Sequence, residues 1–306
     1  MQKTVLILGA SGRFGRNAQI AFHDAGWDVR LFRRGTDNLW DAAWGADVIV
    51  NGWNPAYTDW ARDVPRQTKE VIDVAAASGA LVIVPGNVYP FGPDAPSAFG
   101  PLVSHVAKNQ LGRIRAEMEA AYQRSSARTL ILRAGDFLDT EASGNWFDKI
   151  MIQNLSKGTL TYPGAADVPH AWAFLPDMAR AAVELAETAD QLPRFADIPF
   201  PGYTLTGTEM ARILTEVLGH PMRAKSMSWL PIKLISPFWA MGRCLLEMRY
   251  LWSKPHHLID DPFTALLPEF EPTPVGTALR LAIQHKVSPD QPMPRSGLYV
   301  GKARIV

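Results

Sequence analysis

Short apolar runs alternate with amphipathic stretches along the first half of the chain. The apolar runs predict strands, and the stretches with apolar positions every three or four residues predict helices. The runs contain Val, Ile and Leu without polar alternation, which is typical of strands buried on both faces of a parallel sheet. We predict strands at 4–8, 27–32, 47–51, 80–84 and 129–133, and helices at 16–25, 61–78 and 103–122.

The pattern loosens after about residue 140, where proline and aromatic residues become more frequent. Helices are still predicted at 176–187 and 207–218, the second ending at Gly219. We therefore expect an α/β fold with a doubly wound parallel sheet and a smaller C-terminal lobe. Residues 1–160 are expected to form the main domain, with its sheet completed by parts of 160–200, and residues 161–306 mainly the lobe that closes over it.

Residues 229–252 are rich in Trp, Leu, Ile, Phe and Met. The segment also carries Lys233, Arg243, Glu247 and Arg249, with two prolines inside it, which argues against a membrane span. A buried or partner-facing helix is the favoured interpretation, and an amphipathic surface helix is the alternative. Membrane contact is therefore not expected.

The net charge of the 306-residue chain is +1, so no field favours nucleic acid. The only cysteine, Cys244, suits a reducing compartment, and the N-terminal apolar run is too short for a signal peptide. These features predict a cytoplasmic protein. The pattern predicts no metal site, and the pair His256-His257 is interpreted as a surface loop.

A glycine-rich turn directly follows the first strand and opens a helix. Gly9 allows the tight turn, Gly12 lets the backbone approach a phosphate, and Gly15 lets the helix and strand pack closely. The helix N-terminus then offers free N–H groups to a pyrophosphate. This context predicts a Rossmann-like dinucleotide site, with a purely structural turn as the alternative. The residues expected to contact the cofactor here are Gly9, Ser11, Gly12, Arg13, Phe14 and Gly15.

The second strand ends at Arg33 and Arg34, where an NAD site usually has an acidic residue. A guanidinium suits a 2′-phosphate, and Arg13 could reach the same group. We therefore favour NADP over NAD. The alternative is a solvated strand end that discriminates nothing.

Other candidate cofactor residues follow later strands. Ligands of parallel sheets bind beyond the carboxyl ends of the strands, so these segments should converge on one cleft with the glycine turn. The carboxyl ends supply Asn51, Gly52, Trp53, Gly86, Asn87, Gly135, Asp136 and Phe137.

Three segments extend the pattern beyond the glycine turn. Residues 87–92 (NVYPFG) resemble the segment after the fourth strand in extended short-chain dehydrogenases/reductases, the NAD(P)-dependent epimerase/dehydratase relatives. Residues 112–117 resemble the active-site helix of that family, and residues 174–180 resemble its later step from strand to helix. The resemblance covers roughly the first 220 residues. It implies a hydride-transferring enzyme, with sugar nucleotides among the candidate substrates.

The family's chemistry needs a Ser or Thr, a Tyr, and a Lys four residues after the Tyr. Alignment on the resembling segments puts Pro85, Asn109 and Arg113 at these three places. Arg113 could still bind ribose hydroxyls. Asn109 cannot act as an acid or base near neutral pH. The chain therefore keeps the family's cofactor-binding turn but lacks its three catalytic side chains.

Nearby side chains could supply replacement chemistry. Tyr89 has a suitable hydroxyl, and Asn87 could bind a carbonyl oxygen. Lys108 and His105 lie beside the place of the missing tyrosine. Each has a structural alternative: Tyr89 could wall the pocket, Asn87 could brace its loop, and the two cations could be solvated. His170 is favoured as a hydrogen-bonded structural histidine, and Asp136 contacts the nicotinamide amide or caps its loop.

Two functions fit these observations. The first is an NADP-dependent, epimerase-like oxidoreductase that acts on a carbonyl or hydroxyl group of a small molecule, with positioning more important than acid–base help. The second is a non-catalytic dinucleotide-binding redox sensor or interaction protein. The helix that carries Asn109 and Arg113 pairs subunits in many of the resembled proteins, so a homodimer is an open expectation.

Overall fold

The computed structural model describes residues 2–287 and confirms the predicted α/β class. A six-stranded sheet lies at the centre in the order β10-β6-β4-β3-β1-β2, and every pair in it is parallel. The strand order reverses at β1, so the cleft between the ends of β1 and β3 is where this topology binds ligands. The strands are β1 (Thr4–Leu8), β2 (Asp28–Phe32), β3 (Val48–Asn51), β4 (Leu81–Gly86), β6 (Thr129–Arg133) and β10 (Phe195–Pro199).

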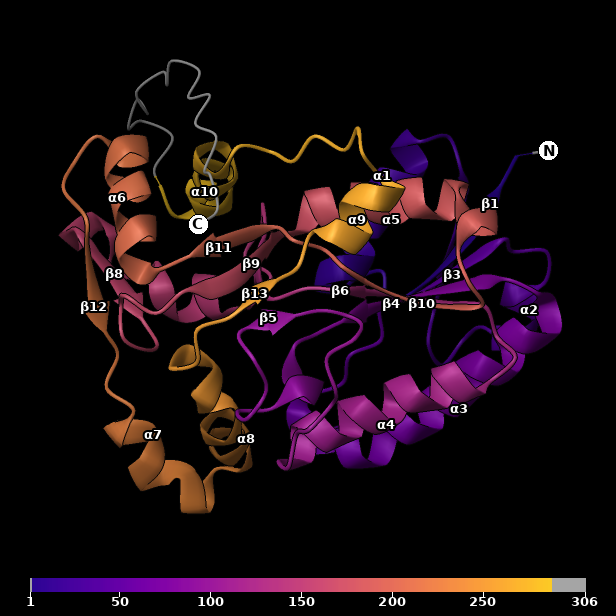
Figure 1. The fold of residues 1–306 in the computed structure, drawn as a ribbon, viewed down its shortest axis with the longest axis horizontal. Coiled ribbons are helices and arrows are strands. Elements are labelled where there is room, and N and C mark those ends of the chain that lie inside the picture. The colour runs from indigo at the N-terminus through magenta and orange to yellow at the C-terminus, as the bar shows by residue number, and fades with distance from the viewer. Residues whose placement is uncertain (1, 288–306) are drawn as a thin grey trace.

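Helices cover both faces of this sheet (Figure 1). The apolar side chains of α1 (Arg13–Asp24) and α5 (Leu175–Glu187) form one core with it, and those of α2 (Leu39–Ala43), α3 (Trp60–Ser78) and α4 (Gln110–Arg124) form another. Because both faces are buried there, β1, β3, β4 and β6 are mainly apolar, whereas the edge strand β2 is partly exposed and carries Asp28 and Arg30.

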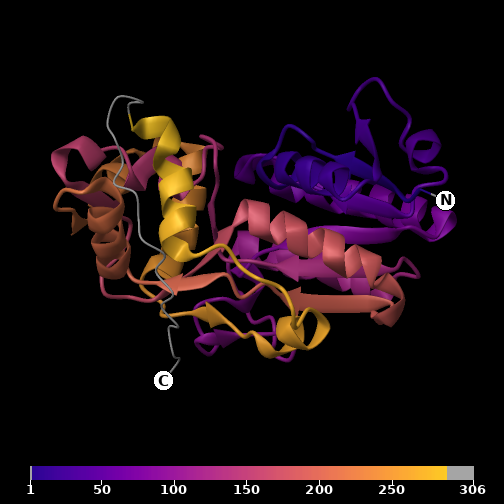
Figure 2. The same cartoon turned by 90° about the horizontal axis from the view of Figure 1, so that it is seen from above.

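A second lobe lies beside the carboxyl ends of the strands (Figure 2). Its own core is separate and contains Phe147, Leu160, Trp172, Leu214 and Leu279. Its small sheets pair β7 (Asp136–Leu138), β9 (His170–Phe174) and β11 (Tyr203–Leu205), then β8 (Thr159–Tyr162) and β12 (Arg223–Ser226), and β5 (Ala98–Phe99) and β13 (His257–Leu258). Its helices are α6 (Gly207–Leu218), α7 (Leu230–Ile235), α8 (Ala240–Met248) and α10 (Val275–Ile283), while α9 (Asp261–Leu266) packs near β10.

The predicted helix at 103–122 is wrong in its first part. Residues 103–109 are not helical, and the Ala107 N–H donates to the Pro90 carbonyl oxygen. The helix α4 begins only after Asn109, which stands at its N-cap. The position that resembles the family's tyrosine is therefore at a helix end and not inside a helix.

The segment 229–252 is not one helix. It divides into α7, a short turn at Ser236–Phe238, α8 and a final turn at Arg249–Trp252. Within residues 2–287, no helix is both long and apolar enough to cross a bilayer.

Candidate functional site

Gly9, in the turn between β1 and α1, and Gly15, in the first turn of α1, have no room for a side chain. Gly9 has a positive φ of 75°, and its carbonyl oxygen accepts a hydrogen bond from the Gly12 N–H at 2.9 Å. A Cβ on Gly15 would lie 2.2 Å from that same oxygen, and a Cβ on Gly52 would lie 2.7 Å from the Leu8 carbonyl oxygen. These close approaches bring bare backbone from two strand ends to the first turn of α1, which is the shape that a pyrophosphate needs.

The remaining residues of the turn face different ways. Phe14 is buried in the core between α1 and the sheet, so only its backbone faces the turn. Ser11 is exposed. The Arg13 guanidinium donates to the carbonyl oxygens of Ser143 and Gly144, at 2.9 and 2.8 Å. A phosphate contact from Arg13 would need an exchange of these bonds, and this role stays a prediction.

A hollow of about 160 Å³ lies beside the end of β2. The Arg34 guanidinium lies 5.0 Å from the centre of the Trp53 ring, and Phe32 packs edge-on against the same ring. Arg33 is largely exposed and forms an ion pair with Asp37 at 3.1 Å. The hollow therefore combines an aromatic face with guanidinium groups. Its lining consists of Phe32, Arg34, Gly35, Asp37, Trp53, Arg66, Gln67 and Glu70.

Two amides at the strand ends brace their own loops. The Asn51 side chain donates to the Tyr122 hydroxyl at 3.0 Å and accepts from the Trp53 N–H. The Asn87 side-chain oxygen accepts from the Tyr89 N–H at 3.0 Å. These bonds fit the structural interpretation of Asn87, although its side-chain nitrogen has no partner among the described residues.

Gly86 and Gly135 stand where other chain segments pass closely. A Cβ on Gly86 would meet the Ile131 side chain at 2.6 Å, and a Cβ on Gly135 would meet the Ala171 carbonyl oxygen at 2.1 Å. Phe137 packs partly buried against the core on the α1 side of the sheet. Packing alone therefore accounts for these three residue types, and their cofactor contacts stay predictions.

The hydroxyl groups of Tyr57 and Tyr89 lie 2.6 Å apart. Burial raises the pKa of both phenols, so both stay protonated at neutral pH. Asp136 adds to this by raising both pKa values further, and Arg13 acts on Tyr57 in the opposite direction. Two hydroxyls that share one hydrogen bond keep one proton free for another acceptor. Tyr57 could not be singled out from the sequence, because it lies in a short turn before α3 with no motif around it.

Asp136 is hydrogen-bonded to the Nε2 atom of the buried His170 at 2.7 Å. The His170 ring stacks on Trp252 at 4.3 Å, so the histidine is hydrogen-bonded and packed, as favoured above. His256 is also buried, 4.4 Å from the His170 ring, and its neighbour His257 is exposed. The expectation that both His256 and His257 lie on the surface is therefore wrong for His256, since its ring fills the space between Phe99 and His170.

The three positions aligned with the family's catalytic residues have structural partners or face solvent. The Pro85 carbonyl oxygen accepts from the buried Arg115 at 2.7 Å. The Asn109 side chain donates to Glu247 of α8 at 3.0 Å. Arg113 is exposed. Arg115 and Glu247 had no motif in the sequence, because their partners are distant along the chain.

The two candidate replacement cations are also engaged. Lys108 forms an exposed ion pair with Asp94 at 2.9 Å, which raises the lysine pKa. The Nε2 atom of His105 lies 3.6 Å from the Glu119 carboxylate. Burial is the main effect on His105 and lowers its pKa. Neither side chain is bonded to the Tyr57–Tyr89 pair in this structure.

Potential ligand atoms of His105, Glu119 and Asp197 lie within 4.8 Å of one another. The fully buried Arg133 is already bonded to both carboxylates, at 2.7 and 2.6 Å. The guanidinium charge occupies the place that a metal cation would take. The cluster is therefore a buried network of ion pairs around Arg133 and not a metal site.

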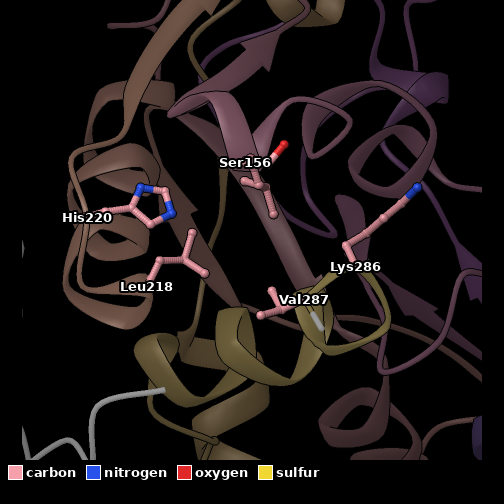
Figure 3. Close-up of a pocket in the computed structure, with 6 residues that line it drawn as sticks. Ser156, Leu218, His220, Lys286 and Val287 are labelled. Carbon is pink, nitrogen blue, oxygen red and sulfur yellow. The ribbon is translucent and has the colours of Figure 1, made fainter. Parts of the chain in front are cut away.

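A further hollow, of about 180 Å³, lies in the second lobe away from the glycine turn (Figure 3). His220, just after α6, and Lys286, after α10, line it, and the Lys286 ammonium points away from His220. The Lys286 ammonium donates a hydrogen bond to the Gln153 side-chain oxygen at 3.2 Å, so it is held by a structural partner. Its other lining residues are Leu155, Ser156, Leu218 and Val287.

No protein-family model and no curated protein sequence matches this chain. Solved structures do resemble it along nearly its whole length. A GalE-like L-threonine dehydrogenase from Cupriavidus necator has 16% identity and a TM-score of 0.70, over 93% of this chain and 100% of that one. A nucleoside-diphosphate-sugar epimerase from Staphylococcus aureus has 15% identity and a TM-score of 0.64, over 90% and 99%.

A third structure, MoeE5 in complex with UDP-glucuronic acid and NAD, has 14% identity and a TM-score of 0.70, over 92% of this chain and 98% of that one. This chain has the same fold as these three proteins. The fold that the sequence resemblance implied is thus confirmed, and it extends into the region after residue 220 where the sequence resemblance was thin.

Proposed function

We propose that this protein is an NADP-dependent oxidoreductase of the epimerase/dehydratase type, acting on a carbonyl or hydroxyl group of a small molecule. The observation that carries the proposal is the close backbone packing at three glycines. Gly9 lies in the turn between β1 and α1, Gly15 in the first turn of α1, Gly52 follows β3, and a Cβ at any of them would strike backbone. The first turn of α1 follows the glycine turn directly, and the free N–H groups of a helix N-terminus are the donors that bind phosphate oxygens. Such a cradle fits a dinucleotide pyrophosphate.

The preference for NADP rests on the hollow at the end of β2. Arg34 is held over Trp53 by a cation–π contact, and Arg66 lines the same hollow. A 2′-phosphate there would receive charge-assisted hydrogen bonds, with Arg33 free to turn to it from its exposed pair with Asp37. The similar protein MoeE5 was solved with NAD, which supports a dinucleotide at this fold position without deciding the 2′ group.

The bound nicotinamide would supply the hydride chemistry. The chain's own contribution is the hydroxyl pair of Tyr57 and Tyr89. In this proposal Tyr89 donates its proton to a substrate oxygen and regains one from Tyr57, whose hydroxyl lies 2.6 Å away, and Tyr57 then takes a proton from solvent. Since burial raises both pKa values, the pair acts better as a hydrogen-bond donor than as a base.

The substrate class that we propose to test first is the sugar nucleotide. MoeE5 binds UDP-glucuronic acid on a similar fold, and the second lobe of this chain lies beside the strand ends, where such a ligand would be enclosed. The decisive experiment uses ligand-stripped protein. Calorimetry with NADPH and NADH tests cofactor binding, and NADPH oxidation is followed with sugar nucleotides, aldehydes and ketones. Absence of heat with both cofactors would overturn the proposal.

A non-catalytic dinucleotide-binding protein is the second candidate. It is favoured by the partners of the positions that align with the catalytic residues, because Asn109 is bonded to Glu247 and Pro85 to Arg115. The calorimetric assay separates the two candidates. Tight NADPH binding without turnover of any substrate in the panel would support the sensor.

A further inference from the structure

The surface of the second lobe carries a cluster of exposed apolar side chains. They lie on residues 229–243, which we call the α7 tip, at the lower left corner of Figure 1 beyond the end of β12. Phe238 is 95% exposed. The other large apolar residues that are exposed on the described part of the chain lie outside this segment, spread between residues 20 and 106. The exposed apolar residues of the tip are Leu230, Leu234, Ile235, Phe238 and Trp239.

The charge around the α7 tip has one sign. Residues 217–246 contain no Asp or Glu. Four exposed cations lie within this stretch, and none of them forms an ion pair with a residue in 2–287. Some exposed cations elsewhere, such as Lys69 and Lys108, do have acidic partners within 3 Å, whereas Arg113 and Arg124 have none among the described residues. The four cations are Arg223, Lys225, Lys233 and Arg243.

We propose that the α7 tip docks on an anionic lipid surface. Leu, Ile, Phe and Trp side chains beside unpaired Lys and Arg are the composition of segments that lie in the bilayer interface, with the apolar side chains in the acyl boundary and the cations at the headgroups. The mode is peripheral, since no described helix can span the bilayer. This inference is independent of the dinucleotide chemistry.

A second copy of the chain is a poorer partner for the same surface. In a symmetric dimer the same patch meets itself, so Lys225, Lys233 and Arg243 would be brought near identical cations. An anionic bilayer neutralises these charges and covers Phe238 and Leu234 at once. Charge complementarity therefore selects the membrane.

The experiment is flotation of the full-length protein with vesicles of phosphatidylcholine, with or without phosphatidylglycerol. We expect binding to the anionic vesicles and little binding to the neutral ones. The double variant Leu234→Glu with Phe238→Glu should lose at least about tenfold in affinity for the vesicles, because two side chains that would enter the acyl boundary of the bilayer become charged. The matched control is Leu102→Glu, at an apolar residue that is 97% exposed outside the tip and should leave binding unchanged.

The variant Lys225→Glu with Lys233→Glu tests the electrostatic half. Reversal of each of these charges should weaken binding to anionic vesicles by at least about fivefold, and added salt should weaken the wild type in the same direction. Absence of wild-type binding to anionic vesicles would overturn the proposal. So would equal binding of wild type and the Leu234/Phe238 variant. Self-association that the same variant abolishes, without vesicle binding, would show that the tip is an interface between copies.

Discussion

The side-chain amide of Asn109 donates a hydrogen bond to the Glu247 carboxylate at 3.0 Å, across 138 positions of sequence. The same carboxylate accepts the backbone N–H of Leu111. Glu247 therefore caps α4 from another helix, and its negative charge lies at the positive end of the α4 dipole. The position that resembles the family's catalytic tyrosine thus serves here in a junction between α4 and α8.

Glu247→Gln should lower the free energy of unfolding by about 1 kcal/mol, because the cap loses its charge while its shape is kept. Urea denaturation followed by circular dichroism measures this. Glu117→Gln is the control, since Glu117 is an exposed acid on α4 that has no ion pair within the described residues. An equal loss in both variants would show that the cap has no special role.

Gly15→Ala should abolish dinucleotide binding, because the added Cβ would lie 2.2 Å from the Gly9 carbonyl oxygen and force α1 away from the turn. We also expect about 1–3 kcal/mol of destabilisation from this overlap. Calorimetry and thermal unfolding check both effects. Gly276→Ala is the control, since a Cβ there would find its nearest neighbour at 3.9 Å inside α10.

Arg33→Ala combined with Arg34→Ala should weaken NADPH binding by about 30-fold, which corresponds to about 2 kcal/mol of lost charge-assisted hydrogen bonds. NADH binding should change far less. Arg124→Ala, at an exposed arginine on α4, is the control for a change in net charge. Equal losses for the two cofactors in calorimetry would contradict the assignment of a 2′-phosphate to these arginines.

Tyr89→Phe should reduce turnover by about 10²-fold or more once a substrate is found, since the proton donor is removed while the ring remains. Tyr57→Phe should have a smaller effect on turnover and should shift the pH profile, because the hydrogen bond to Tyr89 is lost. Tyr203→Phe is the control, as its hydroxyl is bonded to Thr273. Unchanged turnover in Tyr89→Phe would remove it as the donor.

His256 makes stability depend on pH. Burial and then the neighbouring His170 lower the pKa of His256 to about 3, whereas an unfolded histidine has a pKa of about 6.5. Between these values the unfolded chain binds the extra proton, so the free energy of unfolding should fall as pH falls, by about 1 kcal/mol per pH unit. Denaturant titrations from pH 6.5 to pH 4 should show this slope, and His256→Phe should flatten it. His257→Phe, at the exposed neighbour, should leave it unchanged.

The strands and the glycine turn were predictable because their determinants are local. The runs at Thr4–Leu8 and Thr129–Arg133 are buried along their whole length, as their mainly apolar residues predict. The late start of α4 was not predictable, since it depends on Glu247 and on the bond from Ala107 to Pro90. The Tyr57–Tyr89 pair was missed for the same reason, because it forms only when the turn before α3 meets the loop after β4.

Arg133 stands at the end of β6, fully buried, between Glu119 of α4 and Asp197 of β10. The chain reaches β10 only after it has passed through β7, β8 and β9 of the second lobe, so one carboxylate that neutralises this guanidinium lies far along the sequence. A fragment cut before Asp197 would keep a buried cation with only part of its counter-charge, at a high energetic cost. We therefore expect residues 1–160 alone to be less stable than the same residues within the whole chain, because Asp197 lies outside that range.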